Sequence, residues 1–371
     1  MNNVVKNNEK QFSTDYSPLF LNLHQATDNE HFNQIIKDNN PTVYNTITEQ
    51  LVELLRVKNP GIRFSPEEVK LKTDEILGGV PLNNYGNWVY YSWSNTLVHL
   101  LPEDDFIAVR TNRNMYKISP EELLLLRTKK IGIIGLSVGQ SIAQTIATER
   151  ICGELRLADF DSLELSNLNR LNASVMEIGV PKVIIAARKI AEIDPYIKVK
   201  CWPQGITENN IDSFLTDAGK LDVLVEECDG FDIKVLSRIK AKALSIPVVM
   251  DTNDVGMLDV ERFDLEKERA IFHGKVPELE NIPVTELVQK LKTLSFQEKL
   301  GYLTKIIGFE NTSEEMRYSL SQLHKTINGW PQLASAVVLG AAVVTDVCRR
   351  ICLDKFTGSG RFFVHVNELI K

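Results

Sequence analysis

The sequence predicts an α/β fold with a doubly wound sheet, preceded by a small α+β domain. From residue 130 to about residue 250, short apolar runs rich in Val and Ile alternate with segments of helical periodicity. This alternation is typical of parallel strands joined by crossover helices. After Asp251 an apolar run over residues 258–263 indicates an antiparallel strand, so the sheet is expected to be mixed. A glycine turn between the first strand and the first helix makes the predicted fold Rossmann-like.

Three segments are expected along the chain. Residues 1–40 are rich in Asn and Gln and weakly periodic, which predicts a loosely ordered start. Residues 41–107 are expected to form the small α+β domain, with helices over 43–57 and 66–77 and strands over 88–93, 96–101 and 106–109. Residues 108–371 are expected to form the large domain, which ends in a helical region, an apolar helix over 332–352 and a strand over 361–366.

Composition narrows the class of protein. The chain of 371 residues is 43% hydrophobic and 25% charged, with a net charge of -7, and it has no basic stripe that would bind nucleic acid. Its longest apolar run, residues 333–345, is too short to span a bilayer, and the polar N-terminus shows no signal peptide. The five cysteines do not form the pattern of a disulfide framework. We therefore expect a cytoplasmic protein that binds neither nucleic acid nor membrane.

The densest signal lies between residues 130 and 182. A β-branched run ends in a turn that contains Gly135, Ser137 and Gly139, and a second strand ends in Asp159 and Asp161. Such a turn brings phosphates to the free N–H groups of a helix, and the acid after the second strand accepts a ribose hydroxyl. The turn departs from the usual GxGxxG pattern, because Ser137 replaces a glycine. Taken alone, these glycines equally fit close packing of a helix on a strand.

Further polar residues follow at strand ends. Asn167 and Arg170 come after the acidic end of the second strand, Lys182 opens the next helix, and Asp229 closes a later strand. Strand ends of this kind form the ligand-facing edge of an open α/β sheet. Each residue also has a structural alternative, since acids cap loops and helices and cations form surface ion pairs. Five such residues, Asp159, Asp161, Arg170, Lys182 and Asp229, stand at matching strand ends and favour a nucleotide site.

This constellation resembles the ThiF/MoeB family of adenylating enzymes, which is related to the ubiquitin-activating enzymes. The resemblance covers about residues 108–265, and the family motif D-x-D-x-x-E-x-S-N-L-x-R fits Asp159 to Arg170 without a gap. It implies that ATP and Mg²⁺ are bound, with Asp159 at the ribose and Asp229 at the metal. The implied nucleotide-binding residues are Gly135, Ser137, Gly139, Asp159, Asp161, Asn167, Arg170 and Lys182, and the implied catalytic residues are Arg113, Arg170, Lys182 and Asp229.

The resemblance also implies a homodimer in which Arg113 reaches the nucleotide of the partner subunit. The chain departs from the family pattern at several positions, among them Leu171 in place of Gln and Gly230 in place of Asn. It has no Cys-x-x-Cys pair, so the structural zinc of many family members is not expected. No cysteine lies between Cys228 and Cys348, where ubiquitin-activating relatives keep a thioester nucleophile. A thioester step is therefore not expected.

Three functions are compatible with these observations. The first is an ATP-dependent adenylyltransferase that converts a carboxylate to an acyl-adenylate and releases pyrophosphate. Its substrate would be a small-molecule carboxylate or the C-terminus of a small protein or peptide. The second is an NAD-binding oxidoreductase, which uses the same turn and Asp159 but leaves Asn167, Arg170 and Lys182 unexplained. The third is a catalytically altered ThiF-like binding protein, which the altered glycine turn permits.

Overall fold

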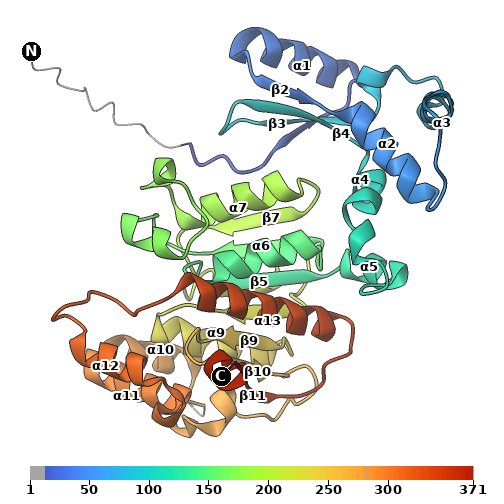
Figure 1. The fold of residues 1–371 in the computed structure, drawn as a ribbon. Coiled ribbons are helices and arrows are strands. Elements are labelled where there is room, and N and C mark those ends of the chain that lie inside the picture. Colours follow the sequence, from blue (N-terminus) through green and yellow to red (C-terminus); the bar gives the residue numbers. More distant parts are fainter. Residues whose placement is uncertain (1–12, 281, 371) are drawn as a thin grey trace, which may run out of the picture. The chain divides into compact units, whose positions relative to one another are not determined.

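The computed structural model describes residues 13–280 and 282–370. The chain divides into two compact units, Met1–Asn112 and Arg113–Lys371 (Figure 1). The boundary lies at residue 112, whereas the sequence predicted it at residue 107. Within the described residues, every helix is too short or too polar to traverse a lipid bilayer.

The N-terminal unit contains a four-stranded sheet in the order β1-β3-β4-β2. Its strands are β1 (Leu19–Leu21), β2 (Thr42–Asn45), β3 (Asn87–Tyr91) and β4 (Thr96–Leu100). β3 and β4 form the predicted antiparallel hairpin, β1 pairs antiparallel with β3, and β2 pairs parallel with β4. The helices are α1 (Ala26–Asn39), α2 (Ile47–Lys58), α3 (Pro66–Leu77) and α4 (Glu103–Arg110), with a short 3-10 helix η1 (Leu82–Asn84).

Two sequence predictions for this unit are wrong. The part of the expected loosely ordered start that the structure describes contains β1 and α1; Leu21 is fully buried and packs with Trp88, against which Phe32 also lies. Leu21 and Phe32 lie far from Trp88 along the chain, so no local periodicity predicted these contacts. Residues 106–109 are helical rather than a strand, because Pro102 precedes three acidic residues that favour a helix N-terminus. Residues 1–12 lie outside the described part of the chain.

The C-terminal unit contains a seven-stranded sheet in the order β11-β10-β9-β8-β5-β6-β7. Its strands are β5 (Lys130–Ile134), β6 (Glu154–Ala158), β7 (Lys198–Trp202), β8 (Val223–Glu226), β9 (Val248–Asp251), β10 (Met257–Glu261) and β11 (Gly360–Phe363). The five strands from β5 to β9 are parallel, and β10 and β11 are antiparallel to their neighbours. This arrangement confirms the predicted doubly wound, mixed Rossmann-like sheet.

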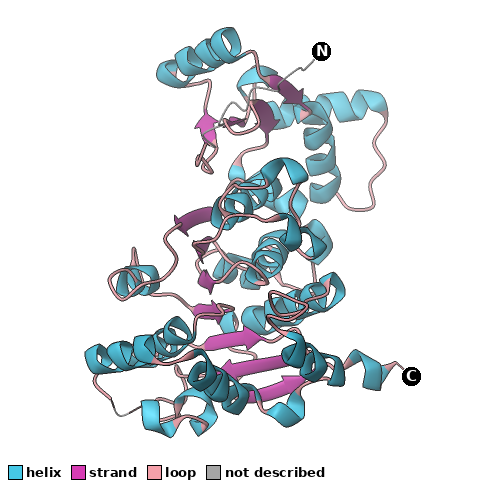
Figure 2. Cartoon of the chain, turned by 90° about the vertical axis from the view of Figure 1, so that its left-hand side faces the viewer, coloured by secondary structure: helices cyan, strands magenta, loops and turns pink. Residues whose placement is uncertain are grey.

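Helices cover both faces of this sheet (Figure 2). The chain runs outward from β5 to β7 through α6 and α7, then returns to β8 beside β5 and continues through α9 to β9. Because parallel crossovers are right-handed, this reversal places α6 and α7 on one face and α8 and α9 on the other. The helices of the unit are α5 (Pro120–Leu126), α6 (Gly139–Glu149), α7 (Lys182–Ile193), α8 (Ile211–Thr216), α9 (Phe231–Ala243), α10 (Val284–Thr293), α11 (Phe296–Ile307), α12 (Glu314–Gln322), α13 (Ala334–Cys352) and α14 (Val366–Leu369).

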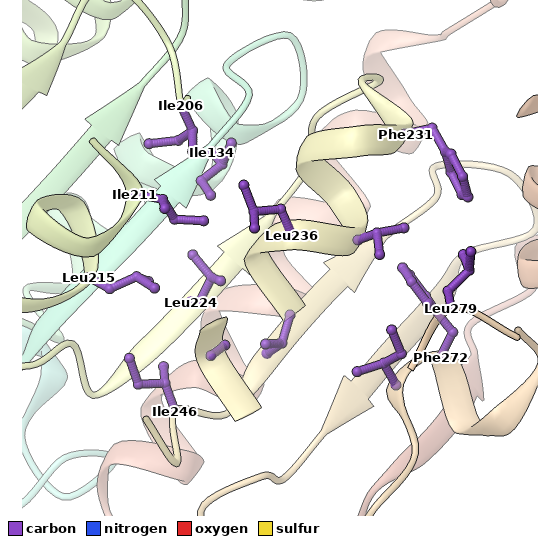
Figure 3. Packing of buried hydrophobic residues seen from close by; sticks show 14 of the residues in the cluster. Ile134, Ile206, Ile211, Leu215, Leu224, Phe231, Leu236, Ile246, Phe272 and Leu279 are labelled. Atoms are coloured by element: carbon purple, nitrogen blue, oxygen red, sulfur yellow. The ribbon is translucent and has the colours of Figure 1, made fainter. Parts of the chain in front are cut away.

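The apolar helix predicted over residues 332–352 is α13, which runs beside α6 and contacts β8, β9 and β10 (Figure 1). A large hydrophobic cluster fills the space around α9; Figure 3 shows Leu236 of α9 with Leu224 of β8 and Ile211 of α8. Short 3-10 helices complete the unit: η2 (Asn112–Asn114, at the boundary), η3 (Leu165–Asn169), η4 (Val175–Glu177), η5 (Ile271–Gly274), η6 (Pro277–Leu279) and η7 (Phe309–Asn311). The packed sheet holds its carboxyl strand ends in fixed positions, and the predicted site residues follow those ends.

Candidate active site

The glycine turn after β5 is built for close approach of backbone segments. Gly135 has a φ of +86°, and a Cβ atom there would lie 2.7 Å from the carbonyl carbon of Glu227. A Cβ atom on Gly139 would lie 2.7 Å from Cγ2 of Ile133. Both positions therefore require glycine. The turn leads into α6, whose first N–H groups have no acceptor within the helix and can face an anion.

The first acid after β6 holds the turn in place. Asp159 is buried; its Oδ2 accepts the backbone N–H of Leu136 at 2.7 Å, and its Oδ1 accepts that of Asp161 at 2.8 Å. Burial raises the pKa of Asp159, while these two hydrogen bonds and the charge of Lys182 oppose the rise. Each carboxylate oxygen keeps capacity for a further donor, such as a hydroxyl group.

Arg170 lies directly against the glycine turn. Its Nη2 and Nε donate to Oγ of Ser137 at 2.8 and 3.2 Å, and its Nη1 donates to Oδ1 of Asn169 at 2.8 Å. Partial burial lowers the pKa of Arg170, and the negative charge of Asp229 opposes this. Asn167 is buried and accepts the N–H of Glu164 at 3.0 Å, so it shapes the loop that carries Arg170.

Lys182 and Asp229 complete the cluster. Nζ of Lys182 lies 2.9 Å from Oδ2 of Asp161, with the lysine side chain 7% exposed. Partial desolvation by the surrounding protein raises the pKa of Asp229, although its carboxylate is solvent-exposed; the charges of Lys234, Lys182 and Arg170 oppose the rise. Within residues 13–280 and 282–370, Asp229 forms no ion pair and accepts no hydrogen bond. Its carboxylate is thus available to an external cation.

The predicted residues share one edge of the sheet. Ser137 follows β5, Asp159 follows β6 and Asp229 follows β8, and β5 lies between β6 and β8 in the sheet. The structure therefore brings together the glycine turn, both aspartates after β6, Arg170, Lys182 and Asp229. Arg113 is separate from this cluster; it lies in η2, and its side chain is exposed.

A buried ion network that the sequence did not predict supports the end of β8. Glu226 is fully buried and pairs with Nζ of Lys234 at 2.9 Å and with Arg238, which also pairs with Glu261. Burial would raise the pKa of Glu226, but the charges of Lys234 and Arg238 outweigh it and lower the pKa to about 2. Lys234 serves this network while also lining the site.

A second unpredicted feature is a pair of acids between β8 and β9. Oε1 of Glu227 accepts the backbone N–H of Asp251 at 2.9 Å. Burial raises the pKa of Glu227 well above its usual value, and the nearby Asp251 charge adds to this. Burial also raises the pKa of Asp251 to about 7. An acid at the end of β9 was visible in the sequence, but its partner depends on the pairing of two parallel strands.

A cavity of about 160 Å³ opens beside the cluster. Ser137, Val138 and Asp229 line one end of it, and side chains from α11, α12 and the 330–332 segment line the other. The segment of residues 330–332 reaches the edge of the site. There the backbone oxygen of Gln332 accepts a hydrogen bond from Nδ2 of Asn169 at 2.8 Å. Oε1 of Gln332 also accepts from Oγ of Ser137 at 3.4 Å. No motif marked Gln332, which lies 163 residues from Asn169 along the chain.

Comparison of the chain with known proteins identifies a family. The model of the ThiF family matches residues 110–319. An uncharacterized protein of Mycobacterium tuberculosis is 42% identical over 283 residues, which are 76% of this chain and 38% of that protein. The chain thus spans about two fifths of that relative's length. The tRNA threonylcarbamoyladenosine dehydratase of Bacillus subtilis is 23% identical over 245 residues, which are 65% of this chain and 95% of that protein.

Solved structures with a similar chain course include two bacterial enzymes. The E. coli tRNA N6-threonylcarbamoyladenosine dehydratase has a TM-score of 0.45 and 16% identity, over 66% of this chain and 95% of that one. The microcin C7 biosynthetic enzyme MccB in complex with N-formylated MccA has a TM-score of 0.44 and 15% identity, over 84% of this chain and 81% of that one. The family match covers more than half of the chain and includes the glycine turn, the motif from Asp159 to Arg170, Lys182 and Asp229. The protein belongs to the ThiF family.

Proposed function

We propose that this protein is an ATP-dependent adenylyltransferase that activates a carboxylate as an acyl-adenylate. The observation that carries the proposal is the gathering of charged groups at one sheet edge: Arg170 donates to Ser137 of the glycine turn, Lys182 pairs with Asp161 after β6, and Asp229 follows β8, the neighbour of β5. An NAD-binding site has no use for this arrangement at the nicotinamide end. A triphosphate with a bound metal ion uses Arg170, Lys182 and Asp229.

The reaction requires little acid-base chemistry. A carboxylate is already ionised at neutral pH, so its oxygen attacks the α-phosphorus, the bond to the bridging oxygen breaks, and pyrophosphate leaves with the electron pair. The main barrier is repulsion between two anions, and preorganised cations lower it. Arg170 and Lys182 have that role here, and the N–H groups at the start of α6 add to it.

The residues present fit ATP and Mg²⁺. Asp159 is held beside the turn with oxygens that can accept a ribose hydroxyl, and Asp229 offers a carboxylate without a protein partner in the described part of the chain. Mg²⁺ is commonly held by one or two carboxylates together with phosphate oxygens. When bound, the metal would neutralise charge on the phosphates. The protein contributes orientation, through Ser137, Arg170 and the turn.

The cysteine nearest the site is unsuited to a thioester step. Sγ of Cys228 donates to Oε1 of Glu226 at 3.0 Å. Burial raises the pKa of the Cys228 thiol well above its usual value, and the charge of Glu226 raises it further. A nucleophilic cysteine needs the opposite shift. The proposed activity therefore ends at the acyl-adenylate, or passes the acyl group to a nucleophile from another molecule.

We further propose that the enzyme acts as a homodimer in which Arg113 approaches the nucleotide of the partner subunit. The exposed position of Arg113, outside the cluster of its own chain, supports this role. The substrate would be a small-molecule carboxylate or the C-terminus of a peptide or small protein.

The test is carboxylate-dependent exchange of labelled pyrophosphate into ATP. Exchange that requires both Mg²⁺ and a carboxylate supports the proposal. Tight, saturable binding of NADH, followed by nicotinamide fluorescence, together with no exchange for any acid, would favour the oxidoreductase. Binding of ATP without exchange would favour a catalytically altered binding protein.

A further inference from the structure

The cavity beside Asp229 has two chemically different ends. Its floor is made by the strand ends and is polar, with Ser137, Asp229 and Thr252. Its other end is made by α11, α12 and the segment before α13, and it is apolar, with Leu300, Leu303, Met316, Leu320 and Trp330. A ligand with one polar end and one apolar end would match this division.

The order of the strands shows which part of a ligand the cavity would receive. Along the sheet edge, β6 carries Asp159, β5 carries the glycine turn, β8 leads to Asp229, and β9 leads to the 252–254 loop. A nucleotide with its ribose at Asp159 and its phosphates at the turn would end near Asp229. The cavity continues from Asp229 past β9, on the side away from Asp159. It therefore lies where the acyl part of the second substrate must sit.

Three polar side chains around the apolar end already have partners. Oγ1 of Thr304 donates to the Leu300 oxygen at 2.8 Å, and Oγ1 of Thr312 donates to the Phe309 oxygen at 2.7 Å. Both carboxylate oxygens of Asp254 accept hydrogen bonds from Ser313, at 2.9 and 2.7 Å. These three groups do not call for a polar ligand. Among the described residues, the buried Oδ1 of Asn253 lacks a hydrogen-bond partner, so the 252–254 loop can accept one hydrogen bond from a ligand. Apolar side chains thus decide what this end of the cavity accepts.

The volume of the cavity indicates how large an apolar group it can hold. Its volume is about 160 Å³. An apolar protein cavity of about 150 Å³ holds one benzene molecule. The cavity as a whole therefore has room for one ring or one branched group of about that size.

From these observations, and resting on the adenylation activity proposed above, we propose that the substrate is a carboxylate whose acyl part bears one medium-sized apolar group, seated between α11, α12 and Trp330. A free branched-chain or aromatic acid has this chemistry, and so does a peptide that ends in an apolar residue. A chain that ends in glycine leaves the apolar end empty.

The first experiment compares probes that differ only in this group. Pyrophosphate exchange is measured with acetate, 4-methylpentanoate, a pentapeptide ending in glycine and the same pentapeptide ending in leucine. Each buried methylene strengthens binding about fourfold, so kcat/KM for 4-methylpentanoate or the leucine peptide is expected to exceed that of its small counterpart by at least about 30-fold. Preference for the free acid or for the peptide identifies the source of the substrate. Equal or better use of acetate and the glycine peptide overturns the proposal.

The second experiment fills the cavity. Leu320→Trp places a larger side chain on its apolar wall, and the preference for the apolar probe is expected to fall at least about tenfold. Tyr318→Trp is the matched control, because Tyr318 lies on the same helix, is 68% exposed and does not line the cavity. Leu320→Ala, which enlarges the cavity, is expected to shift the preference toward longer acids. An unchanged preference in both Leu320 variants overturns the proposal.

A binding measurement separates this inference from the proposed function. Titration calorimetry with 4-methylpentanoate and acetate, in the presence of a non-reactive ATP analogue, does not depend on exchange. Selective binding of 4-methylpentanoate that Leu320→Trp abolishes, without exchange for any acid, supports the cavity assignment and refutes adenylation. Exchange without any preference supports adenylation and refutes the assignment. Neither binding nor exchange with any probe refutes both.

Discussion

The guanidinium of Arg170 donates two hydrogen bonds to Oγ of Ser137, from Nη2 at 2.8 Å and from Nε at 3.2 Å. Ser137 occupies a turn position where glycine is usual. The residue that departs from the glycine pattern therefore also holds the guanidinium of Arg170 beside the turn. We infer that Arg170 turns from Ser137 to phosphate oxygens when a nucleotide binds.

This relationship predicts unequal effects of two substitutions. Arg170→Gln removes the charge and should weaken ATP binding by about 10-fold or more, because a charged hydrogen bond contributes about 1.5–3 kcal/mol. Ser137→Ala leaves the charge of Arg170 in place and removes neutral hydroxyl contacts to Arg170 and Gln332, so ATP affinity should change by less than about fivefold. Calorimetric titration with ATP and Mg²⁺ measures both. A larger effect of Ser137→Ala would mean that the serine, rather than the arginine, binds the nucleotide.

Asp229 is expected to be essential for activity and unimportant for folding. It forms no ion pair in the described residues, so Asp229→Ala should leave the unfolding midpoint close to that of the wild type. Loss of the proposed metal carboxylate should lower pyrophosphate exchange by at least about 100-fold, the usual scale for one electrostatic catalytic group. Asp212→Ala is the control, since Asp212 is an exposed acid paired with Lys240 on the surface. Exchange near the wild-type level in Asp229→Ala would remove its assigned role.

Arg113 provides a test of the dimer. By analogy with arginine residues supplied by a neighbouring subunit, Arg113→Ala should lower the rate by about 10³-fold. Mixing Arg113→Ala with Asp229→Ala chains would form mixed dimers with one intact site. With free exchange of subunits, about a quarter of the wild-type activity should return. If no activity returns although differently tagged chains of the two variants co-purify as dimers, Arg113 does not act across subunits.

The parts of the fold and site that the sequence predicted are those encoded locally. The β5 turn, the motif from Asp159 to Arg170, and Lys182 at the start of α7 lie within one continuous stretch, and each stands at a strand or helix end that periodicity reveals. Asp229 was found because an apolar strand precedes it. In each case the local sequence indicated both the secondary-structure element and the site residue at its end.

The parts that were missed depend on contacts between distant segments. Glu227 meets Asp251 only because β8 and β9 pair in parallel, and Gln332 reaches Asn169 from the far end of the chain. The strand β1 is short and is held in place by its pairing with β3, so its own residues gave no periodic signal that predicts a strand. The helix α4 was read as a strand from its apolar residues, whereas the acids after Pro102 determined its structure.

The partly buried Glu227 and the buried Asp251 predict an unusual dependence of stability on pH. Burial raises the pKa of Asp251 from 3.8 to about 7 in the folded chain. Above the unfolded pKa, the folded state keeps a proton that the unfolded state has lost, so stability falls as the pH rises from about 4 to about 7. Between pH 5 and pH 8 the wild type should therefore lose roughly 3 kcal/mol that Asp251→Asn does not lose.

Urea unfolding of both chains at pH 5 and pH 8 measures this difference. Glu227→Gln should also reduce the loss of stability between pH 5 and pH 8, because it removes the repulsion between Glu227 and Asp251 when both are ionised. If the wild type and Asp251→Asn lose stability in parallel, Asp251 does not carry a raised pKa in the folded protein.

The position of Asp251 also explains a glycine within α13. A Cβ atom on Gly340 would lie 2.7 Å from Cγ of Asp251 and nearer still to its oxygen, so the helix can pass this carboxylate only with glycine there. Gly340→Ala should therefore destabilise the protein by about 1–3 kcal/mol through overpacking, although alanine is the better helix former. The control is Gly301→Ala in α11, where no atom lies within 4 Å of the added Cβ. That change should stabilise by about 0.5–1 kcal/mol. Urea unfolding at constant pH compares the two variants, and stabilisation by Gly340→Ala would show that Asp251 does not lie against α13.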